Sequence, residues 1–243
     1  MSRLRCGELL LRQEFADHVA AHKEREAKEA SLENFNTPEV LAARLVEDLR
    51  SIAEPPGTDG QPVLPLGSVA NFDLAVDFIA CARKLRQSRG EVESKLEIVY
   101  HWTPRENFQN IIDGNLRVPD GKQVLTKTDQ GFYGAGIYTS PDFNYGRAYA
   151  YGTGACFLCI AVPGRRYLAS YPQNLGKPCH PGFDCHVSAD GNQMEWVFFS
   201  SCQLLPCFLV EDATHALALA TANKCLSWLS RDLGEGACHP ISS

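Results

Sequence analysis

A glycine-rich stretch in the second half of the chain constrains the fold more than any other feature. Gly131, Gly134 and Gly136 lie just before the apolar-aromatic pair Ile137 and Tyr138. Glycine lets the backbone approach a flat ligand closely and adopt angles that other residues resist. The stretch therefore predicts a loop that delivers Tyr138 to a ligand site.

The segment after this loop carries the signals of a short helix. Ser140 suits an N-cap, Pro141 suits the first helical position, and Gly152 is a typical helix end. Tyr145 and Tyr149 lie four residues apart and would share a helix face. Aromatic rings that converge from a loop and a helix can hold a planar ring, with stacking worth about 1–3 kcal/mol. The alternative is ordinary half-buried packing of these tyrosines; the density of glycines favours a site.

The composition and the net charge indicate a globular protein and argue against some classes of binding protein. The chain has 243 residues, of which 44% are hydrophobic and 21% are charged, as in a globular protein. The net charge of −6 argues against a general binder of nucleic acid or anionic membranes, because neutralising phosphates needs a basic surface. A local basic pocket is compatible with this charge. No targeting segment is visible, and no apolar run approaches the roughly 20 residues of a membrane helix. We expect an intracellular protein, cytoplasmic or nuclear, that does not bind a membrane.

The 10 cysteines are scattered, and without a signal sequence we expect reduced thiols. Cys156 and Cys159 lie in a strand-like run, where residues three apart face opposite sides, so joint metal binding is not expected. Cys-His pairs at 179–180 and 185–186 carry the ligand types of a zinc site, but adjacent ligands are awkward to orient. A plain loop is the favoured interpretation there, and we expect no metal.

Hydrophobic periodicity divides the chain into a helical first part and a mixed second part. The first part predicts helices over 8–31, 37–52 and 71–88, a linker over 54–62 and a stop at Gly90. The second part predicts strands over 96–100, 155–162, 195–199 and 203–210, the last two being separate or one long bent strand. Thr103 and Glu106 have the spacing of a capping box, which predicts a helix that begins there and ends at Gly114. The remaining segments are predicted to be a polar loop over 117–130, an irregular region over 163–191 and a helix over 214–229. We therefore predict an α+β protein, with an α-helical N-terminal extension over 1–92 and a second domain over 93–243.

Three polar residues lie on the strand-like elements. His101 ends the first strand, Tyr138 follows the glycines, and Glu195 leads directly into an apolar strand. Taken singly, each has an ordinary explanation: a histidine at a strand end is more often structural, and an acid there is often a solvated edge. A carboxylate beside buried surface nevertheless raises the chance of a functional acid.

Together with their neighbours, these residues resemble the motifs of one enzyme family. Segment 99–117 is similar to the first motif of the poly(ADP-ribose) polymerase-like ADP-ribosyltransferases, through Val99 to Thr103, Asn107, Phe108, Ile111 and Gly114 to Arg117. Segment 134–139 is similar to the second motif, and 182–184 with 193–198 to the third. The order is that of the family's His-Tyr-Glu triad, and the intervals of 37 and 57 residues are compatible with it. The resemblance covers about 96–210, and fold and function inferred this way rest on analogy.

The resemblance implies an ADP-ribosyltransferase-like split β-sheet core, mixed or antiparallel, that binds NAD as donor substrate and releases nicotinamide. Tyr138 and Tyr149 would stack on the nicotinamide ring, Glu195 would bond the 2′-hydroxyl of the nicotinamide ribose, and His101 would bond the other ribose. The backbone after His101 would hold the carboxamide, and no metal is required. The implied catalytic residues are Glu195, His101 and Tyr138, and the implied NAD-binding residues are His101, Trp102, Thr103, Arg117, Gly136, Tyr138 and Tyr149.

The chain departs from the family pattern at two positions. Trp102 stands where the family usually has glycine, and Gly146 stands where relatives often have a hydroxyl residue. The backbone of Trp102 could still bond the carboxamide, with its side chain pointing away or reshaping the pocket.

The expected reaction is transfer of single ADP-ribose groups or short chains to a macromolecule. A protein is the expected acceptor and nucleic acid the alternative; 1–92 is shorter than the regulatory helical domain of the DNA-damage-dependent members, and no DNA-binding module is visible. Three other readings are open: a module of the same fold that binds NAD or ADP-ribosylated ligands without turnover, an NAD glycohydrolase, and an interaction protein whose N-terminal helices bind a partner.

Overall fold

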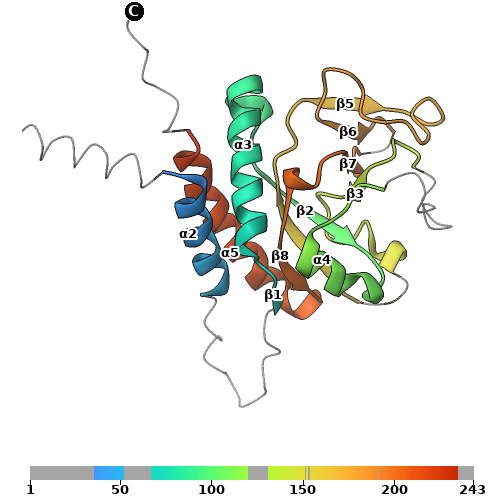
Figure 1. Cartoon of the computed structure of the whole chain (residues 1–243). Coiled ribbons are helices and arrows are strands. Elements are labelled where there is room, and N and C mark those ends of the chain that lie inside the picture. The colour runs from blue at the N-terminus through green and yellow to red at the C-terminus, as the bar shows by residue number, and fades with distance from the viewer. Residues whose placement is uncertain are drawn as a thin grey trace, which may run out of the picture.

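The computed structural model describes residues 36–51, 67–119, 131–150, 152, 154–190 and 192–234. Within these ranges the chain is α+β, as predicted, with helices and two mostly antiparallel sheets. Figure 1 shows the long helices gathered on one side of the molecule and the sheets on the other. The predicted helix over 8–31 and the predicted linker over 54–62 lie outside the described residues.

Three long helices confirm the helical predictions at 37–52, 71–88 and 214–229. They are α2 (Pro38–Arg50), α3 (Phe72–Glu93) and α5 (Asp212–Asp232). The side chains of Thr37 and Asn71 cap the first turns of α2 and α3, and Glu211 forms a capping box with Thr214 at the start of α5. Near its end α3 is interrupted at Gly90, whose φ of 80° breaks the helical backbone where the sequence predicted a stop.

Two four-stranded sheets form the other half of the fold. The first has the order β1-β8-β4-β2 and is antiparallel throughout, whereas the second has the order β3-β7-β6-β5 and contains one parallel pair, β5 with β6. The strands are β1 (Gly67–Ser68), β2 (Glu97–Trp102), β3 (Ile137–Thr139), β4 (Cys156–Ala161), β5 (Arg166–Ala169), β6 (Cys185–Ser188), β7 (Trp196–Phe198) and β8 (Leu204–Val210).

The four predicted strands are confirmed, and the last two lie in different sheets. The prediction that 163–191 is irregular was wrong, because this region contains β5 and β6. Each has four residues. β6 is buried along its whole length, and the sequence of β5, Arg-Tyr-Leu-Ala, has no regular alternation of polar and apolar residues, so neither carries the pattern by which a half-buried strand is recognised.

The hydrophobic core lies on both faces of β4. Cys156, Leu158 and Ile160 face a cluster that includes α2, α3 and α5, whereas Phe157 and Cys159 face a cluster that includes α4. Cys156 and Cys159 therefore point to opposite sides of the sheet, as predicted. The described helices of the first part of the chain share one core with the first sheet; the division of the chain at 92 and 93 stays a prediction.

The capping box predicted at Thr103 was wrong. A 3-10 turn, η1 (Arg105–Asn107), precedes the helix α4 (Phe108–Gly114), and the Thr103 hydroxyl accepts a hydrogen bond from Asn107 Nδ2 at 2.8 Å rather than capping a backbone N–H. The helix does end at Gly114, as predicted. Beyond it, Asn115 adopts a φ of 69°, and its side-chain amide donates to the Ser201 and Leu204 carbonyls, which fixes the turn toward Arg117.

The helix predicted over 140–152 was also wrong. The described residues of this segment form turns followed by the 3-10 helix η2 (Arg147–Ala150). The Ser140 hydroxyl accepts from the Asp142 N–H, as a cap would, but the Asp142 carboxylate then accepts from the Asn144 N–H at 2.7 Å. Such a local side-chain bond competes with helical bonding, and a short helix has little cooperativity to oppose it.

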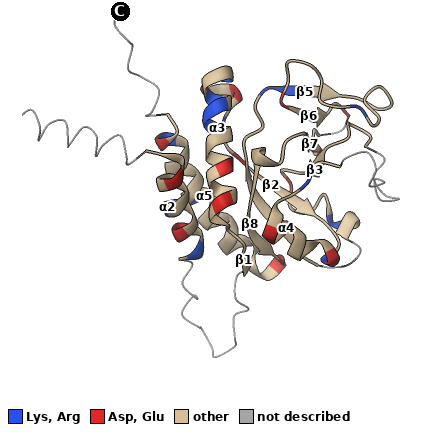
Figure 2. Ribbon diagram, viewed as in Figure 1, with Lys and Arg blue, Asp and Glu red and all other residues tan. Residues whose placement is uncertain are grey.

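Charge is mixed over the helical side of the molecule. Figure 2 shows acidic and basic residues on both α2 and α3; along α3 the acidic residues of the first turns lie apart from the basic residues nearer its other end. Among the described residues, none of the helices combines the length and the apolar character needed to cross a membrane.

Candidate active site

A cavity of about 460 Å³ brings together residues from segments that are far apart in the sequence. Its wall is formed by the end of β2, by α4 and the residues after it, by β3, by the turns after β3, and by the residue before β7. This volume is typical of a small-molecule site. All eight residues that the sequence singled out line it: His101, Trp102, Thr103, Arg117, Gly136, Tyr138, Tyr149 and Glu195.

The two sheets meet at this cavity. Tyr100 of β2 and Ser140, which follows β3, exchange a pair of backbone hydrogen bonds of 2.8 and 3.0 Å. This bridge places the end of β2 beside β3, and therefore His101 beside Tyr138. Tyr138 in turn pairs with Val197 of β7, which begins directly after Glu195. The strand register thus converts three distant residues into neighbours.

His101 is held in one tautomer by the backbone of Tyr138. Its Nδ1 lies 2.8 Å from the Tyr138 carbonyl oxygen, so Nδ1 carries the hydrogen and donates. Burial lowers the pKa of His101, and this bond opposes the shift only in part. The ring is therefore neutral at neutral pH, and Nε2 is the nitrogen that can accept a hydrogen bond from a hydroxyl group.

The hydroxyl of Tyr138 closes the glycine-rich loop on itself. It accepts from the Tyr133 N–H at 2.9 Å and donates to the Gly134 carbonyl at 3.0 Å. A Cβ on Gly136 would lie 2.5 Å from the Phe198 carbonyl oxygen of β7. From the sequence, these glycines were expected to let the backbone approach a ligand. The structure shows that the close neighbour of Gly136 is the strand β7. The approach of Gly136 to β7 positions the Tyr138 ring.

Tyr145 contacts Glu195 directly, a pairing that sequence reasoning missed. The Tyr145 hydroxyl donates to Glu195 Oε1 at 2.8 Å. Tyr145 and Tyr149 both line the cavity although no helix carries them. The pKa of Tyr145 is raised mainly by desolvation of the phenol and, to a smaller extent, by the bond to Glu195. This hydroxyl therefore remains a donor at neutral and alkaline pH.

The two departures from the family pattern pack against each other. Trp102 is 7% exposed, lies in the helix-side core and donates from Nε1 to the Phe143 carbonyl at 2.7 Å. A Cβ on residue 146 would lie 2.5 Å from Trp102 Cδ1, so only glycine fits beside this ring. The bulk of Trp102 thus takes the space that a side chain at 146 would need.

The turns that carry Tyr145 and Tyr149 are tied to the start of α5. The Phe143 ring stacks on His215 with centroids 4.0 Å apart, and the Tyr100 hydroxyl lies 2.7 Å from His215 Nε2. Arg147 lies over Phe143, 4.9 Å from its centroid, and pairs with Asp212. Burial lowers the pKa of His215, which leaves its ring neutral in this contact.

Of the two Cys-His pairs considered as zinc ligands, the pair Cys185 and His186 makes other contacts. His186 Nδ1 donates to the Tyr133 carbonyl, and its Nε2 accepts from the His180 N–H at 2.8 Å. Cys185 lies in the hydrophobic cluster on the α4 side of the sheet. Within the described ranges, no group of three or more histidine, cysteine, aspartate or glutamate residues could hold a metal ion.

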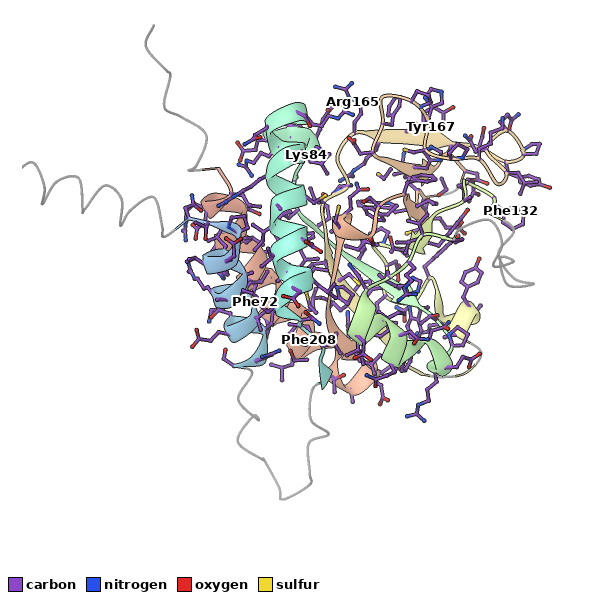
Figure 3. All side chains as sticks on the ribbon, viewed as in Figure 1. Phe72, Lys84, Phe132, Arg165, Tyr167 and Phe208 are labelled. Atoms are coloured by element: carbon purple, nitrogen blue, oxygen red, sulfur yellow. The ribbon has the colours of Figure 1, made fainter. Side chains whose placement is uncertain are left out.

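One side of the cavity reaches the edge of the molecule that is opposite to α2. Phe132 lines it, and Figure 3 shows Phe132 at the edge of the molecule opposite to α2, with Phe72 of α3 near the helical side. Phe132 also forms an edge-to-face pair with Tyr171, with centroids 5.0 Å apart. Comparisons of the sequence with models of protein families and with curated proteins give no match. The functional argument therefore depends on the residues and geometry of the cavity.

Proposed function

We propose that this protein is an NAD-dependent ADP-ribosyltransferase of the poly(ADP-ribose) polymerase-like class, and that its two sheets are the split core of that fold. One observation carries the proposal: the His, Tyr and Glu of three separate sequence motifs line one cavity, together with every other residue assigned to NAD. Motifs that arose by chance would have no reason to converge in space.

The proposed donor site follows from the chemistry of the lining. The Tyr138 ring, fixed through its hydroxyl, and the Tyr149 ring are the platforms for nicotinamide. The backbone of Trp102 is the proposed partner of the carboxamide. His101 Nε2 would accept a hydrogen bond from a hydroxyl of the adenine-side ribose, which requires the neutral ring that burial favours. Arg117 is the proposed contact near the adenine.

Glu195 is the proposed catalytic residue, and it acts as a carboxylate. When the bond between C1′ of the ribose and the nicotinamide nitrogen breaks, nicotinamide leaves with the electron pair and the ribose gains oxocarbenium character. A carboxylate bonded to the ribose 2′-hydroxyl interacts more strongly as this charge develops. The acceptor nucleophile then bonds to C1′ and loses its proton. A carboxylate oriented in advance gives the largest benefit.

The proposed products are single ADP-ribose groups or short chains on a protein, with nucleic acid as the alternative acceptor. The proposed location is intracellular, cytoplasmic or nuclear. A binding module without turnover is the second candidate, because Trp102 stands where the family has glycine. The Trp102 ring is packed in the core against Gly146, which supports a defined place for its bulk beside the cavity. NAD glycohydrolase activity would differ only in using water as acceptor.

The experiment is nicotinamide release from NAD by the wild type, Glu195→Gln and Glu106→Gln. Glu106 is exposed and does not line the cavity, so its variant is the matched control. We expect Glu195→Gln to lower turnover on the order of 100-fold, the scale of losing one electrostatic contact to a transition state. NAD affinity measured by calorimetry should change little, and the control should match the wild type. Equal turnover in Glu195→Gln would remove Glu195 from the mechanism.

A further inference from the structure

We propose that Tyr145 is a positioning residue for Glu195, an inference that rests on the proposed function. The two side chains come from segments 50 residues apart and meet at the cavity, where the Tyr145 hydroxyl donates to Glu195 Oε1 at 2.8 Å. Neither the triad nor the stacking pair implied by the sequence includes this residue. Its role is to hold the carboxylate in the orientation that the ribose hydroxyl requires.

The backbone under Tyr145 is fixed although its ring is 44% exposed. The Tyr145 N–H donates to the Asp142 carbonyl at 3.3 Å, and the Asp142 carboxylate accepts from the Asn144 N–H. The next residue, Gly146, is pressed against the Trp102 ring. The phenol is therefore presented from a defined backbone rather than from a free loop.

The backbone of Glu195 is fixed from the other side. Its N–H donates to the Ser188 hydroxyl at 3.2 Å, and its carbonyl accepts from the Ser188 N–H at 2.9 Å. Ser188 is the last residue of β6, so Glu195 is bound to the second sheet while its carboxylate is bound to the turns after β3. A glutamate side chain loses much rotamer freedom when it is ordered. The bond from Tyr145 imposes this order before NAD binds.

The phenol suits this task because it donates without adding charge. A hydrogen bond to a charged acceptor is stronger than one between neutral groups. The neutral donor leaves the negative charge of Glu195 available to the developing cation. Burial and the bond itself keep Tyr145 protonated into the alkaline range, as described above.

The test compares Tyr145→Phe with the wild type in steady-state nicotinamide release. The variant keeps the ring and removes only the hydroxyl, and Tyr171→Phe, an exposed tyrosine that does not line the cavity, is the matched control. We expect kcat to fall about 10-fold, the scale of one hydrogen bond to a charged group, while the KM for NAD stays within about 2-fold. Tyr171→Phe should behave as the wild type.

A double-mutant cycle decides whether the hydroxyl acts through Glu195. In a Glu195→Ala background, measured by single turnover with excess enzyme, Tyr145→Phe should have no further effect. A similar loss in both backgrounds would overturn the inference, and so would a rise in KM at unchanged kcat, because Tyr145 would then contact NAD itself. An active wild type with an unaffected Tyr145→Phe variant overturns the inference alone. Absence of nicotinamide release from the wild type overturns the proposed function, and the inference falls with it.

Discussion

The contact between Trp102 and Gly146 predicts a substitution whose effect changes sign with its surroundings. In Gly146→Ala the new Cβ would lie 2.5 Å from Trp102 Cδ1, closer than Cβ atoms approach other atoms in proteins, and 3.1 Å from Cγ, which is also a tight contact. The ring is held by the bond from Nε1 to the Phe143 carbonyl and is buried in the core, so it cannot simply turn aside. Overpacking of this kind costs about 1–3 kcal/mol.

The sign reverses when Trp102 is made small. Gly146 does not have a positive φ, so alanine meets no backbone strain there. Gly→Ala at a compatible position stabilises a protein by about 0.4–1 kcal/mol, because the unfolded chain has less freedom. In a Trp102→Ala background the 2.5 and 3.1 Å contacts are gone and only the 3.2 Å approach to Cβ of residue 102 remains, so Gly146→Ala should be close to neutral or stabilising.

Urea unfolding followed by circular dichroism measures the effect as the free energy of unfolding. The four variants of the cycle should give a coupling energy of about 1–4 kcal/mol between positions 102 and 146. Trp102→Ala alone can cost about 3–5 kcal/mol, so the cycle compares the change that Gly146→Ala makes in each background rather than the absolute stabilities. An equal destabilisation by Gly146→Ala with and without the tryptophan would refute the claim that the two residues compensate each other.

Three further predictions concern the ligand, the pH and metals. Tyr138→Ala should weaken NAD binding by about 1–3 kcal/mol in calorimetry, the scale of one stacking platform, and an unchanged affinity would place the stack elsewhere. Burial lowers the pKa of His101, His186 and His215 below the ordinary value of 6.5, so the unfolded chain takes up protons at a higher pH than the folded chain. The free energy of unfolding should therefore fall as the pH drops below about 6.5. His215→Gln should reduce the slope of the free energy of unfolding against pH, and a slope equal to that of the wild type would exclude His215 as a source. Activity should be unaffected by EDTA, whereas a loss that added zinc restores would revive a role for the Cys-His pairs.

The long elements could be predicted from the sequence because their signals are local and repeated. The helices and the buried strand at Cys156 to Ala161 have enough residues for a periodic or continuous apolar pattern. The candidate site residues come from three motifs whose order constrains them together; these residues line one cavity, and their roles stay predictions. Their convergence in the cavity depends on strand pairing, which cannot be predicted from any single motif.

The errors lie where short segments depend on tertiary contacts. The Ser140 hydroxyl does accept from the Asp142 N–H, but the Asp142 carboxylate accepts from the Asn144 N–H, and the segment forms turns rather than a helix. β5 and β6 are too short for a pattern, and their pairing with the second sheet defines them. The bond from Tyr145 to Glu195 joins two loops, so no spacing in the sequence predicts it.

The central claim is that the cavity cleaves NAD and transfers ADP-ribose to a macromolecule. The most direct measurement is incubation of the full chain with NAD labelled on the adenylate, followed by separation of nicotinamide, free ADP-ribose and labelled macromolecule, with Glu195→Gln in parallel. We expect nicotinamide release by the wild type together with label on protein, and both on the order of 100-fold lower in Glu195→Gln at equal protein. Release of nicotinamide with free ADP-ribose as the sole labelled product, across a range of offered proteins and nucleic acids, would contradict the transferase and favour a glycohydrolase. NAD binding without any release of nicotinamide would contradict catalysis altogether.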